Sequence, residues 1–171
     1  GAETDVGQLR SMMAAHNRLQ QYEEAVALGE RVLQTHAEEP VIWSYYADAL
    51  QKTGKVTEAV QAMDRVLELD PAYQNAVARQ AQWMFDAGRQ DEAVAALRQG
   101  VQRGSLSSND AALRVFAVAY QKGVQPQQWE TAVRLVRLGK EFEVNEDTRQ
   151  QLDFWLGYSL YNKARAQQEP Q

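Results

Sequence analysis

The chain has 171 residues, of which 44% are hydrophobic and 24% charged, and its 18 Lys and Arg against 23 Asp and Glu give a formal net charge of −5. We expect neither a membrane span nor a signal segment, because no run approaches ~20 apolar residues and no charged-then-apolar leader is present. The absence of cysteine excludes disulfides, thiol nucleophiles and sulfur-ligated zinc, and the acidic balance argues against a general nucleic-acid binder. Four prolines and ten glycines are too few for an all-β chain, so the composition favours an all-α protein.

One sequence segment recurs along the chain. It reads YEEAVALGERVL from Tyr22, VTEAVQAMDRVL from Val56 and QDEAVAALRQGV from Gln90, at intervals of 34 residues. A fourth copy, WETAVRLVRLGK from Trp129, begins five residues after the position that the 34-residue interval predicts, and the extra length falls in residues 123–128. We interpret these residues as a loop, where an insertion costs little.

Each period predicts two helices. In the second period, apolar residues between Trp43 and Leu50 follow the spacing i, i+3, i+4, i+7 of one helical face, and residues 59–67 repeat that pattern. Gly54 lies between the two faces and predicts a helix end, because glycine accepts the left-handed backbone conformation. Pro40 and Pro71 predict helix starts. The last predicted helix covers residues 146–166.

Small residues at equivalent positions predict where neighbouring helices approach most closely. A larger side chain there would separate the paired helices. These positions are Ala47, Ala81, Ala117 and Gly157 on first helices and Ala25, Ala59, Ala93 and Ala132 on second helices.

The pattern Trp43-x-x-Tyr46-Ala47-x-x-Leu50, with Gly54 and Ala59, resembles the tetratricopeptide repeat (TPR). This resemblance implies an all-α TPR solenoid, with antiparallel helix pairs in a right-handed superhelix of about nine helices. We expect a single domain over residues 1–171, with repeats at about 6–39, 40–73, 74–108 and 109–145 and a truncated fifth repeat at 146–171. Because the chain ends where the second helix of that fifth repeat would begin, we expect it to be a piece of a longer protein.

First helices line the concave face in this family and hold extended peptides or chain termini there. The resemblance places the following residues in that groove: Arg10, Asn17, Tyr45, Asp48, Lys52, Arg79, Gln82, Phe85, Arg114 and Lys122. With Arg18 and Asp86, which occupy further groove positions, six basic residues face two acidic ones. Such a groove would attract an acidic protein or peptide. The other interpretation is a solvated helix face, and both remain open.

Some relatives grip a terminal carboxylate with Lys, Asn and Arg side chains at five set positions. The corresponding residues here are Arg10, Ala14, Tyr45, Asn75 and Arg79. Only the two arginines suit that role, which argues against this carboxylate clamp.

The last predicted helix carries an aromatic row of Phe154, Tyr158 and Tyr161, with Trp155 beside it. These side chains could anchor a peptide. The favoured interpretation is that they pack against the fourth repeat and against a partner helix beyond the end of the chain.

No catalytic residue, metal site or cofactor is predicted. The chain has no phosphate-binding glycine loop, nucleophile elbow or HExxH motif, and its two histidines, His16 and His36, lie on different predicted helices. We therefore expect a non-enzymatic scaffold that binds a peptide or protein segment. The alternatives are a structural module that oligomerises through its end repeats and an accessory TPR region of a larger multidomain protein. Arginines outnumber lysines by 13 to 5, which favours a bacterial source, with cytoplasm and periplasm both open.

Overall fold

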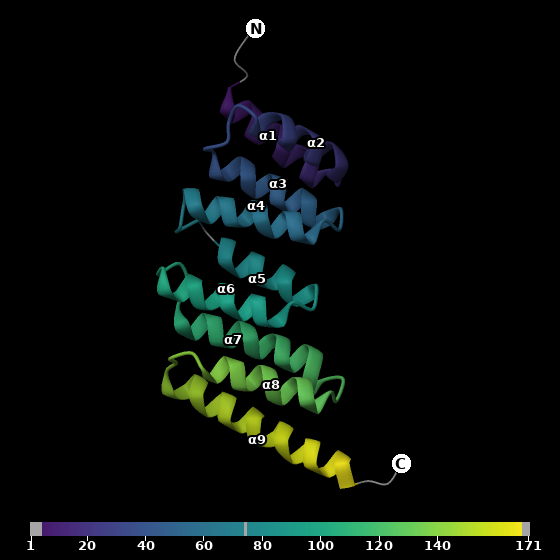
Figure 1. Cartoon of the computed structure of the whole chain (residues 1–171), viewed down its shortest axis with the longest axis vertical. Coiled ribbons are helices and arrows are strands. Elements are labelled where there is room, and N and C mark those ends of the chain that lie inside the picture. Colours follow the sequence, from purple (N-terminus) through teal and green to yellow (C-terminus); the bar gives the residue numbers. More distant parts are fainter. Residues whose placement is uncertain (1–4, 74, 169–171) are drawn as a thin grey trace. The chain divides into compact units, whose positions relative to one another are not determined.

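The computed structural model describes residues 5–73 and 75–168. Within them the chain forms nine α-helices and one π-helical turn, and it contains no strand, which confirms the all-α prediction (Figure 1). No described helix is long and apolar enough to span a membrane. The elements are α1 (Val6–Arg18), α2 (Tyr22–Leu33), α3 (Pro40–Lys52), α4 (Val56–Leu69), α5 (Ala76–Asp86), α6 (Gln90–Gln102), α7 (Ser108–Ala119), η1 (Tyr120–Val124), α8 (Trp129–Lys140) and α9 (Glu146–Gln168).

The chain divides into two compact units, Gly1–Ala96 and Leu97–Gln171, and the division falls within α6. The expected single domain over residues 1–171 stays a prediction, and each unit is described by itself. Residues 169–171, at the end of the predicted fifth repeat, lie outside the described residues.

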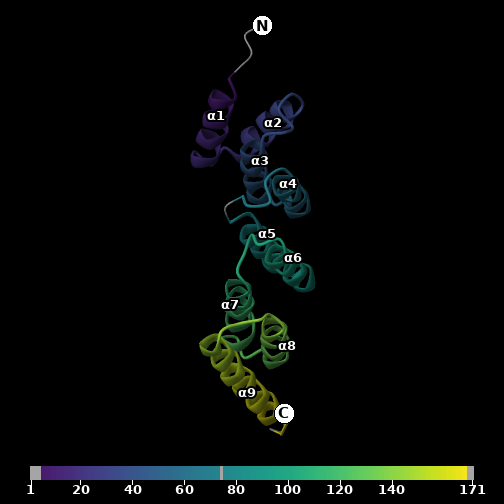
Figure 2. The same ribbon diagram turned by 90° about the vertical axis from the view of Figure 1, so that its left-hand side faces the viewer.

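The N-terminal unit consists of helix pairs. In Figure 2, α1 and α3 lie to the left of α2 and α4, and α3 packs against both α2 and α4. The core between these helices contains the fully buried side chains of Met13, Ile42, Leu50 and Met63. The unit is therefore layered, with first helices on one side and second helices on the other.

Residues with a left-handed backbone conformation end the first helices of this unit. After α3, Gly54 has a φ of 82°, the Lys55 N–H donates to the Leu50 carbonyl at 2.9 Å, and the Gly54 N–H donates to the Gln51 carbonyl at 3.1 Å. These are the two bonds of a Schellman motif, and Gly88 forms the same closure after α5. The helix end predicted from Gly54 is therefore confirmed.

The C-terminal unit packs α8 against α7, η1 and α9. Its core contains Val115, Leu135, Val136 and Leu152, which are fully buried. In place of the loop predicted at residues 123–128, the π-helix η1 begins at Tyr120 and extends α7 through Val124 before a turn reaches α8. The added length is thus partly absorbed by the wider helical turn.

Most of the small residues predicted at close helix contacts are buried. The fully or almost fully buried ones are Ala25, Ala47, Ala59, Ala81, Ala93 and Ala132. The prediction is wrong for Ala117 and Gly157, which are exposed. Apart from the backbone of its own helical turns, a methyl group added at Gly157 would meet no described atom within 4 Å, because no described residue lies against that side of α9.

Candidate peptide-binding surface

The predicted groove residues of the N-terminal unit lie on α1, α3 and α5. Asn17 of α1 donates its side-chain amide to the Tyr45 carbonyl of α3 at 3.0 Å, which ties the two first helices together. The Tyr45 ring packs on the core cluster that includes Leu9, Met13 and Ile42. The Asn17 side chain is therefore engaged in a hydrogen bond between α1 and α3, and the Tyr45 ring is engaged in packing against the core.

Arg10 of α1 forms an ion pair with Glu39, which precedes α3. The guanidinium Nη2 lies 2.5 Å from the Glu39 Oε2, and the two side chains are 46% and 32% exposed. An ion pair this exposed contributes about 0–1 kcal/mol. Arg10 therefore remains available to a competing carboxylate, since little free energy holds it to Glu39.

Arg79 of α5 is held from three sides. Its guanidinium forms an ion pair with Asp48 of α3, donates to the Ser44 hydroxyl at 3.1 Å and lies 5.4 Å from the centre of the Trp83 ring. Burial raises the pKa of the Asp48 carboxyl above its ordinary value of 3.8, and the positive charges of Arg79 and Lys52 oppose that rise. The positive charge of Arg79 is thus largely neutralised inside the unit.

A hollow of about 520 Å³ opens between α1 and α3. Its lining residues are Arg10, Ser11, Ala14, Ala15, Arg18, Leu19 and Tyr45. Arg18 is exposed and forms no ion pair with any residue that the structure describes. The hollow combines two accessible guanidinium groups with the exposed apolar side chain of Leu19. This surface can accept a carboxylate and an apolar group side by side.

The remaining predicted groove residues have other surroundings. The Gln82 amide donates to Asp86 at 2.9 Å on the same helix. Phe85 is only 1% exposed, so its assignment to the groove surface is wrong, and its ring belongs to the core. Arg114 on α7 and Lys122 on η1 lie in the C-terminal unit, so the predicted set is divided between the two units.

Three residues of this surface were missed by the sequence prediction. Leu19 and Ser11 line the hollow, and Glu39 pairs with Arg10. Leu19 could have been noticed as an apolar residue directly after the predicted end of a helix. The pairing of Arg10 with Glu39 spans 29 residues and leaves no local signal in the sequence.

The aromatic row of α9 divides into packed and exposed side chains. Trp155 lies 5.9 Å from Phe116 and 5.3 Å from Tyr120, measured between ring centroids, so it packs on the fourth repeat as expected. Phe154 and Tyr161 are 64% and 66% exposed.

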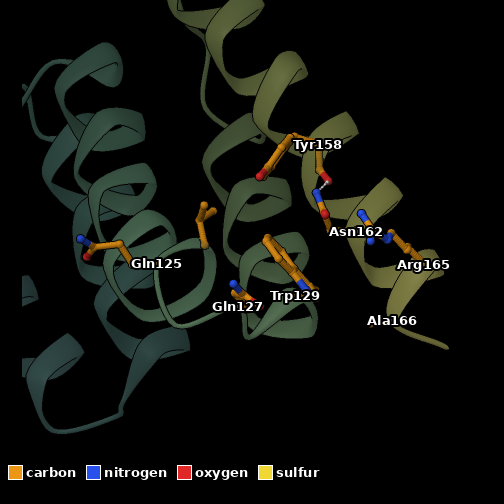
Figure 3. Close-up of a pocket in the computed structure, with 8 residues that line it drawn as sticks. Gln125, Gln127, Trp129, Tyr158, Asn162, Arg165 and Ala166 are labelled. Atoms are coloured by element: carbon orange, nitrogen blue, oxygen red, sulfur yellow. Dashed lines mark hydrogen bonds between the residues drawn. The ribbon is translucent and has the colours of Figure 1, made fainter. Parts of the chain in front are cut away.

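Tyr158 borders a polar hollow of about 340 Å³ in the same unit (Figure 3). Its ring lies edge-on to Trp129 of α8 at 5.9 Å between centroids. Asn162 donates its amide to the Tyr158 carbonyl at 2.8 Å, and Arg165 and Gln127 also line the hollow. The polar lining and open shape of this hollow set it apart from the apolar outer face of α9.

Among the described residues, no group of three or more His, Cys, Asp or Glu side chains could hold a metal ion. The His16 ring lies 2.9 Å from the Gln21 amide oxygen, and the His36 ring lies 2.8 Å from the Thr35 hydroxyl. Both contacts are local, within five residues along the chain.

Residues 18–80 match the tetratricopeptide repeat family. This stretch of the chain consists of tetratricopeptide repeats. The matched TPR segment covers α2, α3 and α4, the region where the sequence pattern is clearest. No curated protein sequence matches the chain.

Solved structures of other proteins share this TPR fold. MamA from Desulfovibrio magneticus RS-1 is 17% identical with a TM-score of 0.57, over 93% of this chain and 91% of that one. A second MamA structure is 12% identical with a TM-score of 0.58, over 93% and 85% of the two chains. The TPR-like repeats of a Podosopora anserina kinesin light chain are 22% identical with a TM-score of 0.51, over 95% and 88%. At these identities the comparison establishes the fold.

Proposed function

We propose that this TPR chain is a non-enzymatic protein-interaction scaffold, and that the hollow between α1 and α3 binds an acidic peptide segment. This proposal rests on two arginines that line the same hollow. Arg18 has no ionic partner among the described residues, and Arg10 is held only by an exposed ion pair with Glu39. TPR repeats and the absence of a recognised catalytic motif favour a binding role over catalysis.

Arginine suits this role because its planar guanidinium can donate two parallel hydrogen bonds to a carboxylate. A peptide carboxylate that reaches Arg10 would replace Glu39, and the exposed ion pair costs about 0–1 kcal/mol to break. Leu19 and Ala14 lie in the same hollow and offer apolar contact beside the charges. The preferred ligand is therefore an extended segment in which acidic residues alternate with apolar ones.

The test uses fluorescein-labelled eight-residue peptides that contain glutamate and leucine, with glutamine replacing glutamate in the control peptide. Fluorescence anisotropy of the intact chain should show binding of the acidic peptide that weakens with added salt, because exposed charges are screened. The double variant Arg10→Glu with Arg18→Glu should weaken binding at least tenfold, since each hydrogen bond to a charged group contributes about 1.5–3 kcal/mol.

A matched control is Arg103→Glu, which makes the same charge change at an exposed position of the C-terminal unit. We expect a change in affinity of less than about twofold for this control, because Arg103 lies outside the hollow. Equal binding of the glutamine peptide, or equal losses in the control and the double variant, would reject the hollow as the binding site.

A further inference from the structure

The outer face of α9 carries a continuous row of exposed residues. The row alternates steps of three and four residues and comprises Asp147, Gln150, Phe154, Gly157, Tyr161, Ala164 and Gln168, all of them exposed. The buried residues of this helix, Thr148, Leu152 and Ser159, lie on the opposite side. Steps of three and four are the heptad spacing by which one helix presents a seam to another.

The centre of this row is apolar and close to solvent. Phe154 and Tyr161 are each about two-thirds exposed, while aromatic side chains of this size usually bury most of their surface. Gly157 and Ala164 complete the apolar centre, and polar residues lie at both ends. This distribution is typical of an interaction surface, with an apolar middle and a polar rim.

Within the C-terminal unit, α9 has neighbours on one side only. It packs along α8, and the ion pairs Lys140–Asp153 and Lys163–Glu130 connect the two helices. These pairs run in opposite order along the two helices, so α8 and α9 are antiparallel. In Figure 1 the other side of α9 faces away from α8, and no described helix of this unit covers it. The row is thus rigidly held and presented outward.

The row is complementary to itself in the antiparallel direction. When two copies of α9 cross at Gly157, Phe154 of each copy lies within one residue of the level of Tyr161 in the other, and Asp147 lies within one residue of the level of Gln168. Gly157 then meets its own symmetry equivalent, and its open surroundings allow the two helices to approach closely. The aromatic pairs and the close glycine contact would bury the apolar centre from both sides.

Charge favours the same direction. The first turn of α9 carries Glu146 and Asp147, while Arg165 lies in its last turn. An antiparallel pair brings the acidic end of one copy within about one helical turn of the basic end of the other. It also places the positive end of each helix dipole beside the negative end of the other, which is favourable. A parallel pair would place like charges together.

We propose that this chain forms a homodimer in which the outer faces of two α9 helices pair in antiparallel, with the two-fold axis at Gly157. The interface involves the C-terminal unit alone. It is therefore independent of the peptide-binding hollow between α1 and α3.

Multi-angle light scattering of the intact chain tests the assembly. We expect a mass of about 39 kDa at concentrations near 100 μM, twice the 19.3 kDa of one chain. The double variant Phe154→Lys with Tyr161→Lys should halve that mass, while its circular dichroism spectrum stays helical, because both side chains are exposed in the monomer. The control Gln167→Lys, on an exposed position outside the row, should stay dimeric.

Single cysteines test the register, because the natural chain contains none. Gly157→Cys places a thiol beside its symmetry equivalent, so mild oxidation should link most of the chains as dimers. In Gln150→Cys the two thiols would lie about 20 Å apart along the helix axis, from the 1.5 Å rise per residue, which is far beyond the reach of a disulfide. This variant should stay unlinked.

A monomeric natural chain at 100 μM would overturn the proposal, as would a dimer that survives the double lysine variant. Equal linking of Gly157→Cys and Gln150→Cys would overturn the antiparallel register. Peptide binding by Arg10 and Arg18 is measured separately by anisotropy, so failure of either proposal leaves a distinct result.

Discussion

Two glycines of the C-terminal unit predict opposite responses to the same substitution. Gly123 lies in η1, and a methyl group added there would come within 2.6 Å of the backbone nitrogen and Cα of Ala132 in α8. Gly157 lies in α9, and the same methyl group would meet no atom within 4 Å. Neither glycine has a positive φ, so alanine can adopt both backbone conformations. The difference is therefore one of space alone.

The expected magnitudes follow from these surroundings. Carbon atoms normally approach to about 3.5–4.0 Å, so Gly123→Ala requires η1 and α8 to separate by roughly 1 Å. Overpacking of this kind costs about 1–3 kcal/mol, and the preference of a helix for alanine over glycine returns about 0.5–1 kcal/mol. We expect a net loss of about 1–2 kcal/mol for Gly123→Ala. For Gly157→Ala we expect a gain of about 0.5–1 kcal/mol, since only the helix preference contributes.

Urea denaturation followed by circular dichroism at 222 nm measures both changes. The midpoint should fall by about 0.5–1 M for Gly123→Ala and rise for Gly157→Ala, with unchanged slopes. The experiment is performed at micromolar concentration or below, so that association through α9 does not contribute. A rise for Gly123→Ala, or a fall for Gly157→Ala, would refute the argument from space.

Three further changes have outcomes that the structure predicts. Gly29→Ala brings a methyl group 2.5 Å from the Tyr46 ring, which can shift more easily than backbone. We therefore expect the free energy of unfolding, measured in urea, to fall by about 1 kcal/mol, and the near-ultraviolet tyrosine signal to change. Gln20→Gly removes the side chain at a left-handed φ of 59° and should raise the free energy of unfolding by about 1 kcal/mol; an unchanged midpoint would contradict this. Because burial raises the pKa of Asp48 above 3.8, the folded chain binds this proton more tightly than the unfolded chain, and stability should fall as the pH rises through the raised pKa. Asp48→Asn should make the free energy of unfolding less dependent on pH, as measured by urea titrations at several pH values. An unchanged pH dependence would argue against the raised pKa of Asp48 as its cause.

The sequence predicted those helix boundaries that depend on local signals. Pro40 begins α3 and Gly54 ends it because each acts on the backbone of its own turn. The same closure after α1 uses Gln20, and the turn before α8 uses Gln127, both in the left-handed region without glycine. These two positions have no compositional signal, because hydrogen bonds of the surrounding turn hold them in a conformation that glutamine rarely adopts.

The candidate site was predicted in outline and corrected in detail. The family pattern identified Arg10, Arg18 and Tyr45 as groove positions, and all three line the hollow between α1 and α3. Arg79 and Asp48 were both counted in that groove, and the structure joins them in an ion pair between neighbouring helices, 31 residues apart in the chain. Glu39, which pairs with Arg10, was not counted, so the sum of groove charges overstated how basic this surface is.

By itself, the sequence determined that the chain forms helices, that they recur every 34 residues, and which face of most of them is apolar, because all three properties depend on spacing along one chain. Only the tertiary structure decided which charges are neutralised, which aromatic rings are buried and which small residues touch a neighbour, since these depend on residues brought together from different helices. Gly157 shows the difference: its position in the repeat predicted a helix contact, and its surroundings in α9 are open.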